Sequence, residues 1–479
     1  MALEEGKPPG SGRPAATLGT IHAVMLIVGI VIGAGIFKAP SMVAQMSGDA
    51  GWMFAAWVLG GAISLIGALC YAELATAYPS AGGDYHFLHR AYGRSVSFLF
   101  GWARFSVITT GSIALLAFVF GDYMQQAMPL PVARASLGSA LYALAATAAL
   151  WAVNSRGIRA GVSTQGWFTT LEVLGLLVIV AGAVRLFVDG PAPAPTAQET
   201  VFGAMPGAGA FGLAMVFVLL TYGGWNEAGY VSAELKDTRR NMVTALVVSI
   251  LFITVLYLLV NWAYWRGLGI EGMAKSEALA AQLVGAAFGP AAEKLIAILV
   301  AVSALTSMNA TMIVGARTNY AVGCDWGALA RLAHWDAARG SPANAMHLQN
   351  AAAILLVVLG AWTGQGFRSM VEFTAPVFWL FFLLTGIALF VLRRREPEAP
   401  HPFRVPLYPV LPILFCATCA YMLWSSLSYV YSQKLGGLNA AWIGVAVLAA
   451  GCVVLALLRF FDSGPRAVPS QPGDVRGTS

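Results

Sequence analysis

The chain has 479 residues, of which 58% are hydrophobic and only 10% are charged, and its formal net charge is +6. Soluble proteins carry about 25% charged residues, so this composition excludes an ordinary soluble enzyme, a disordered chain and a secreted disulfide scaffold. It indicates an all-α polytopic membrane protein. The positive charge does not indicate nucleic-acid binding, because the basic residues lie in loops between apolar runs and are explained by membrane topology.

Twelve apolar runs follow one another along the chain, and each is long enough to cross a bilayer as a helix. We predict these spans at approximately residues 17–44, 51–78, 95–121, 135–153, 164–187, 210–233, 241–265, 287–316, 345–362, 369–392, 406–431 and 438–461. We expect spans one to five (17–187) and six to ten (210–392) to form two repeats, followed by spans eleven and twelve (406–461). The tails, 1–16 and 462–479, are rich in Gly, Pro and Ser and are predicted to be disordered.

The distribution of lysine and arginine predicts the orientation in the membrane. With the N-terminus in the cytoplasm, the inner loops and tails carry 19 of these residues and the outer side carries seven, while Lys38 and Arg104 lie within spans. We therefore expect both termini to be cytoplasmic, in a cell inner (cytoplasmic) membrane.

Two glycine clusters interrupt the apolar runs of spans one and six, at residues 29–37 (GIVIGAGIF) and 220–226 (LTYGGWN). Glycine costs about 1 kcal/mol relative to alanine inside a helix, so each cluster favours local unwinding. Backbone groups freed in mid-membrane cannot face lipid and must line a cavity or contact a ligand. N–H groups at a half-helix start suit a carboxylate, and carbonyls at a half-helix end suit an ammonium. These are the two ends of an amino acid.

The alternative is that these glycines only allow close helix packing. The paired positions favour a binding site, because interruptions at corresponding places in two halves of a transporter mark its substrate site. An inverted repeat of five plus five spans would bring both breaks together at the midplane.

Four stretches, at residues 29–37, 71–92, 221–241 and 318–325, resemble the amino acid–polyamine–organocation superfamily and, within it, the L-type amino acid transporter branch. The resemblance implies the LeuT-type fold, with helices one and six broken, and transport by alternating access. It implies that the backbone around residues 33–36 binds the substrate carboxylate, and that carbonyls near residue 32 and residues 220–223 bind the amino group. The predicted substrate-binding residues are Ile32, Gly33, Ala34, Gly35, Ile36, Leu220, Tyr222, Gly223, Gly224, Trp225, Asn226 and Glu227.

The sequence departs from the branch in three places. Leu220 occupies a position where the branch often has an aromatic gate, and Glu172 occupies one where it often has a lysine. The loop after span three, residues 122–135, lacks the cysteine that joins relatives to a heavy subunit, so we expect no disulfide-linked heavy subunit.

Glu172 lies well inside span five. A charge at the bilayer centre costs roughly 2.5–3.5 kcal/mol, so this carboxyl is expected to be protonated, paired or next to an ion. We predict that it is the coupling group, which takes up and releases a proton. The alternative is a static hydrogen bond or a partnership with Arg104.

Several other polar residues have two interpretations. Glu227 faces the substrate or, as we prefer, stabilises the start of the second half-helix. Tyr222 and Trp225 are expected to pack against an apolar substrate side chain. Glu73 is close in sequence to Arg90, and Glu234 to Lys236, Arg239 and Arg240, so both acids are predicted to form inner-gate ion pairs or to be solvated helix ends. Glu372 is a vestibule residue or a buried acid whose partner the sequence does not identify.

We therefore predict a secondary active transporter that moves amino acids as a proton symporter or an exchanger. The first alternative is an amine or polyamine antiporter of the same superfamily, and the second is a membrane nutrient sensor that does not transport. The histidines do not form a metal-ligand cluster and there is no nucleophile–base pair, so no metal, cofactor or enzyme activity is expected.

Overall fold

The computed structural model describes residues 24, 27–29, 31–78, 83–155, 165–189, 202–226, 238–336, 342–364, 366–432 and 440–461. Nearly all of these residues are helical. The helices are α2 (Gly35–Ser47), α3 (Ala50–Ala77), α4 (Gly83–Tyr92), α5 (Arg94–Ala103), the π-helix η1 (Arg104–Ile108), α6 (Thr109–Ala127), α7 (Ala135–Ser155), α8 (Gln165–Asp189), α9 (Ala208–Thr221), α10 (Thr238–Lys275), α11 (Leu279–Phe288), α12 (Pro290–Asp325), the short η3 (Gly327–Leu329), α13 (Ala343–Thr363), α14 (Gly366–Arg395), α15 (Val410–Ser432) and α16 (Ala440–Phe461).

Ten helical segments in the described part of the chain are long and apolar enough to cross a membrane. They match the predicted spans two to five and seven to twelve. Helices α5, η1 and α6 together correspond to predicted span three. Two shorter apolar helices, α9 and α11, accompany them. The prediction of an all-α polytopic membrane protein is therefore confirmed.

Two helices were not predicted. The α4 sequence, GDYHFLHRAY, is too short and too polar to resemble a span. The α11 sequence is apolar but has only 10 residues, and the predicted eighth span began within it. Gly289 separates α11 from α12, and its φ of 90° is a conformation that favours glycine. Pro290 then begins α12, where the missing N–H of proline costs nothing.

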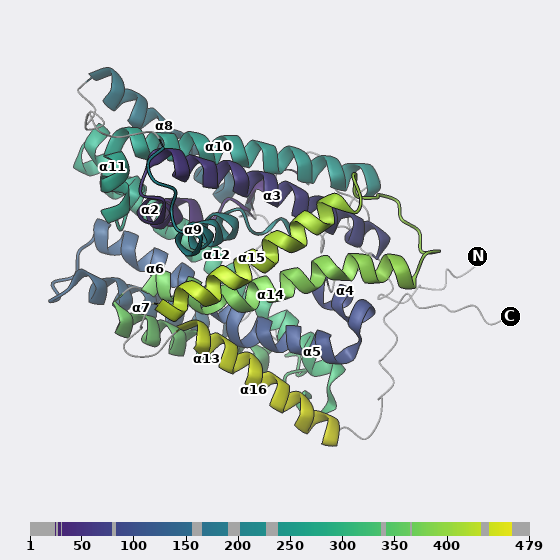
Figure 1. Ribbon diagram of the computed structural model, residues 1–479. Coiled ribbons are helices and arrows are strands. Elements are labelled where there is room, and N and C mark those ends of the chain that lie inside the picture. Colours follow the sequence, from purple (N-terminus) through teal and green to yellow (C-terminus); the bar gives the residue numbers. More distant parts are fainter. Residues whose placement is uncertain are drawn as a thin grey trace, which may run out of the picture.

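Figure 1 shows a bundle in which α4 and α11 lie toward opposite ends. At the α4 end, the fully buried carboxylate of Glu73 at the end of α3 accepts two hydrogen bonds of 2.6 Å from Arg393 at the end of α14. It also accepts one of 2.7 Å from the backbone N–H of Val405. Glu73 is thus in an ion pair, as one of the two interpretations predicted, but its partner is Arg393 and not the nearby Arg90, which pairs with Glu396.

Candidate functional site

The first helix is interrupted where the sequence predicted. Helical backbone at Val31 gives way to a non-helical segment at residues 32–34, and α2 begins at Gly35. The N–H of Ile32 still donates to the Val28 carbonyl at 2.8 Å, and Ala34 caps α2 without a side-chain hydrogen bond. The first N–H groups of a helix have no partner within it, so the start of α2 presents donors at the break.

The second interruption follows α9, which ends at Thr221. A turn continues through residues 222–224 to a single 3₁₀ turn at Trp225 and Asn226. Gly224 has a φ of 108°, a conformation that side chains on Cβ disfavour. Glu227 and Glu234 lie outside the described residues.

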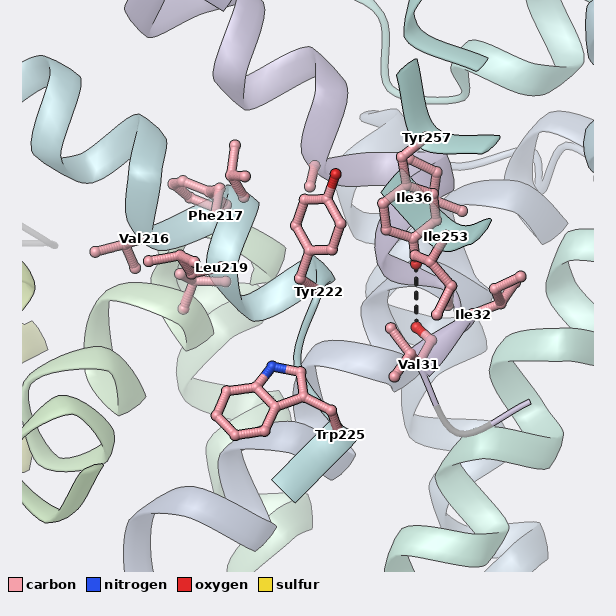
Figure 2. Packing of buried hydrophobic residues seen from close by; sticks show 14 of the residues in the cluster. Val31, Ile32, Ile36, Val216, Phe217, Leu219, Tyr222, Trp225, Ile253 and Tyr257 are labelled. Atoms are coloured by element: carbon pink, nitrogen blue, oxygen red, sulfur yellow. Dashed lines mark hydrogen bonds between the residues drawn. The ribbon is translucent and has the colours of Figure 1, made fainter. Parts of the chain in front are cut away.

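The two breaks are adjacent in space. A Cβ added to Gly35 would lie 3.3 Å from the Thr221 hydroxyl oxygen and 3.5 Å from its Cα. The phenol oxygen of Tyr257, on α10, lies 3.1 Å from the Val31 carbonyl oxygen and 3.2 Å from that of Thr221, so one hydroxyl is shared by the last residue before each break. Figure 2 shows this phenol directed at Val31.

A cavity of about 400 Å³ begins at the breaks and extends toward α4. Its volume lies in the range of small-molecule sites. Gly29 and Asn226 line it beside the breaks, and α12 contributes Ser307 and Thr311. The remaining wall includes the charged residues Asp84 and Arg104, the polar residues Thr109, Ser112 and Thr385, and the aromatic residues Phe100, Phe378, Phe381 and Phe382.

The predicted aromatic residues lie beside this cavity rather than on its wall. Tyr222 is buried, packs on Trp57 and donates to the Trp57 carbonyl at 3.2 Å. Trp225 packs edge-on against Tyr71, with ring centroids 5.2 Å apart, and against Phe382, which does line the cavity. Figure 2 shows that the rings of Tyr222 and Trp225 point in different directions. Of the predicted side chains on the second break, Asn226 reaches the cavity.

Glu172 lies on α8 and is 6% exposed. Its carboxylate accepts a hydrogen bond from the hydroxyl of Ser303 on α12. One turn further along the same face of α12, Ser307 lines the cavity, and its hydroxyl oxygen lies 4.0 Å from the position of a Cβ on Gly33. Ser303, which contacts Glu172, and Ser307, which lies near Gly33, are therefore on the same face of α12.

The sequence did not identify Asp84 or Arg104 as cavity residues. Asp84 belongs to the unpredicted helix α4, and Arg104 begins the π-helix η1 in the third span. Single π-turns widen a helix and occur frequently at functional sites. The charge of Arg104 inside a span was the one available signal, since an intramembrane charge commonly marks a substrate pathway.

The sequence did not identify a partner for the buried acid Glu372. In the structure its carboxylate pairs with the guanidinium of Arg368, with 2.9 Å between nitrogen and oxygen.

The comparisons with known proteins agree with this architecture. The sequence model of the amino acid permease family matches residues 18–452. The chain belongs to the amino acid permease family. This confirms the predicted amino acid–polyamine–organocation superfamily and identifies a membrane transporter rather than an enzyme.

Similar proteins include three transporters of the L-type branch. The human b(0,+)-type amino acid transporter 1 is 29% identical over 426 residues, covering 88% of this permease and 85% of the relative. The mouse Asc-type amino acid transporter 1 is 28% identical over 460 residues, covering 94% and 82%. The human large neutral amino acids transporter small subunit 2 is 28% identical over 438 residues, covering 88% and 78%.

Proposed function

We propose that this permease moves free amino acids by alternating access and binds them where the two broken helices meet. The observation that carries the proposal is the contact between Gly35 and Thr221, together with the shared hydroxyl of Tyr257. Two backbone interruptions in one place provide N–H donors and carbonyl acceptors within a few ångströms of each other. The three relatives are amino acid transporters by name, which supports the same substrate class.

In the proposed pose the substrate carboxylate accepts hydrogen bonds from N–H groups at residues 33–36, at the start of α2, where the helix dipole favours an anion. The ammonium donates to carbonyls at residue 32 and at residues 220–223. The substrate side chain points into the cavity past Asn226, between Ser307 on α12 and Phe382 on α14. The described wall carries one acid, Asp84, and one base, Arg104, beside four phenylalanines, and this balance of charge suits neutral side chains.

Glu172 is the proposed coupling group. Burying a neutral carboxyl in the membrane costs less free energy than burying a charged one. Proton uptake by the buried Glu172 therefore removes a charge beside α12. Because Ser303 and Ser307 lie on one face of that helix, the change reaches the first break. A permease with this group carries out proton symport, whereas exchange of one amino acid for another needs no proton.

We also propose that the α4 end of the bundle faces the cytoplasm of a cell with an inner membrane, with both termini on that side. Arg90 and the run Arg393–Arg395 lie at this end, as the bias of lysine and arginine toward the cytoplasm requires. We propose further that the permease needs no disulfide-linked heavy subunit, because the segment between α6 and α7, residues 128–134, contains no cysteine.

Counterflow in proteoliposomes tests the function. Vesicles with purified permease are loaded with one unlabelled amino acid and given trace labelled amino acids or amines outside. We expect saturable accumulation of amino acids that amines lacking a carboxylate do not inhibit. Accumulation driven equally well by such amines would reject the carboxylate site and favour an amine antiporter. No accumulation of any amino acid would reject the proposed function, and repeating the assay with an imposed pH gradient separates symport from exchange.

A further inference from the structure

At the end of the bundle opposite α4, the segment that leads into the start of α11 is bonded to the half-helix α2. Lys38 on α2 is only 2% exposed. Its ammonium donates to the backbone carbonyl of Glu277 at 3.0 Å and also pairs with the Glu277 carboxylate. It forms a second ion pair, at 2.7 Å, with Asp122 on α6. The three hydrogens of one lysine thus join three parts of the fold.

Two further contacts connect the same parts. Ser41, one turn after Lys38, donates to the Ser276 carbonyl at 2.9 Å. Tyr123, next to Asp122, donates to the Phe37 carbonyl at 2.8 Å and accepts from the N–H of Ala280 at 3.4 Å. We call residues 276–280 the lid segment, because all of these contacts hold it against α2 and α6.

These contacts pack α2 against the lid segment and α6 at this end of the bundle, whereas the cavity extends the other way. The cavity wall includes residue 29 before the first break and residue 226 after the second, and among the described residues it includes none from α2, the lid segment or α11. A bound substrate would therefore have α2 and the lid segment between it and this end of the molecule.

We propose that Lys38 latches an outer gate between α2 and the lid segment, and that it releases Glu277 and keeps Asp122 when the gate opens. This inference rests on the proposed transport function. Asp122 lies on the same side of the gate as Lys38 in a largely buried place, whereas the side chain of Glu277 is 76% exposed. When the lid segment leaves, Glu277 enters water and Lys38 keeps Asp122.

The two acids therefore have opposite roles. Removing the only partner of a buried charge is strongly destabilising, so a lysine with Glu277 alone would hold the gate shut. Asp122 makes opening possible because the ammonium stays paired. Glu277 favours closure, and its exposure keeps the cost of separation low.

Cross-linking across the gate tests the proposal. Ser41→Cys and Ser276→Cys are combined in a full-length chain whose five native cysteines are replaced, and the protein in proteoliposomes is treated with a short bifunctional thiol reagent. We expect a cross-link that stops counterflow, and a reducible reagent should give a block that dithiothreitol reverses. In the single-cysteine variants the reagent should leave counterflow at the level of the same variant without treatment. A cross-linked protein that still transports, or two cysteines that never cross-link, would overturn the gate.

The rate of cross-linking then separates the two acids. Glu277→Gln should lower the rate because the gate spends less time closed, and Asp122→Asn should raise it and slow counterflow. Glu271→Gln is the matched control, since Glu271 is also exposed but contacts only Lys275 at 3.4 Å within the described residues. Equal rates in all three variants would reject the role of Lys38. Cross-link yield is read by mass spectrometry and needs no substrate, so this result stands even if the permease carries no amino acid.

Discussion

Gly35 lies against Thr221 so closely that a Cβ at residue 35 would be 3.3 Å from the threonine hydroxyl oxygen and 3.4 Å from its methyl carbon. The start of α2, which follows the first break, therefore packs on Thr221, the last residue before the second break. The close approach requires the small residue at this position, since added atoms in a packed interior force neighbours to move.

This contact predicts the effect of enlarging residue 35. Gly35→Ala should destabilise the protein by about 1–3 kcal/mol and reduce counterflow, because the new methyl group overpacks the junction. Thr221→Ala removes the two nearest atoms, the hydroxyl oxygen and the methyl carbon, and leaves the Cα at 3.5 Å, so the double variant should recover much of the loss. Thermal unfolding in detergent and counterflow measure the two effects. Additive losses in the double variant would contradict the contact.

Tyr257→Phe should weaken the junction of the breaks. It removes the one hydroxyl shared by the carbonyls of Val31 and Thr221, and an unsatisfied buried polar group costs about 1–3 kcal/mol. We expect lower thermal stability and a higher half-saturating substrate concentration. Tyr264→Phe is the control, because Tyr264 is equally buried on the same helix but its hydroxyl has no partner among the described residues. Equal effects of both substitutions would argue against a special role of Tyr257.

Glu172→Gln tests the coupling group. Glutamine keeps the shape of the side chain but cannot take up the proton, so uptake driven by a pH gradient should fall to the level without a gradient while exchange continues. Ser303→Ala removes the hydrogen bond and keeps the carboxyl, so gradient-driven uptake should persist. Transport assays with and without the imposed gradient decide this, and a glutamine variant that is still driven by the gradient would exclude the role.

Two ion pairs at the α4 end should differ sharply in how much they contribute to the free energy of unfolding. Glu73→Gln leaves the mostly buried Arg393 without its carboxylate, and breaking a buried pair costs about 3–5 kcal/mol. Glu396→Gln breaks the exposed pair with Arg90, which is worth about 0–1 kcal/mol. Unfolding midpoints of the two variants provide the comparison. Similar midpoints would show that burial does not govern these pairs.

The same exposed pair predicts a small dependence of stability on pH. Hydrogen bonding from Arg90 lowers the pKa of Glu396 below its usual value. A carboxyl with a lowered pKa in the folded state adds stability above its unfolded pKa, and this contribution disappears as the pH falls through the folded value. The difference in unfolding midpoint between wild type and Glu396→Gln should therefore be present near neutral pH and vanish in acid. A difference that grows in acid would contradict this sign.

The sequence predicted the fold and the breaks because both depend on local composition. Apolar length identified ten spans, and the glycines at residues 33, 35, 223 and 224 marked where the helices are interrupted. Nothing local distinguishes Tyr257 from other tyrosines in apolar helices, so its position between the breaks had to come from tertiary packing. Helix α11 was missed because ten apolar residues are too few to span a bilayer.

Charged partners were the least predictable part of the site. Glu73 and Arg393 are 320 residues apart, and Glu172 and Ser303 are 131 apart, so no spacing rule joins them. The prediction for Glu73 named Arg90, which is near in sequence. The side chains of Asp84 and Arg104 reach the cavity through an unpredicted helix and a π-turn, neither of which has a reliable signature in a single sequence.

The buried carboxylate of Glu73 has a consequence for biosynthesis. Arg393 and the N–H of Val405 follow it in the chain by more than three hundred residues, so α3 leaves the ribosome long before its acid can be neutralised. During that interval the carboxyl must stay in water at the membrane surface, which anchors the end of α3 there. A nascent chain truncated after α13 would lack both Arg393 and Val405, so the carboxylate of Glu73 would never be buried.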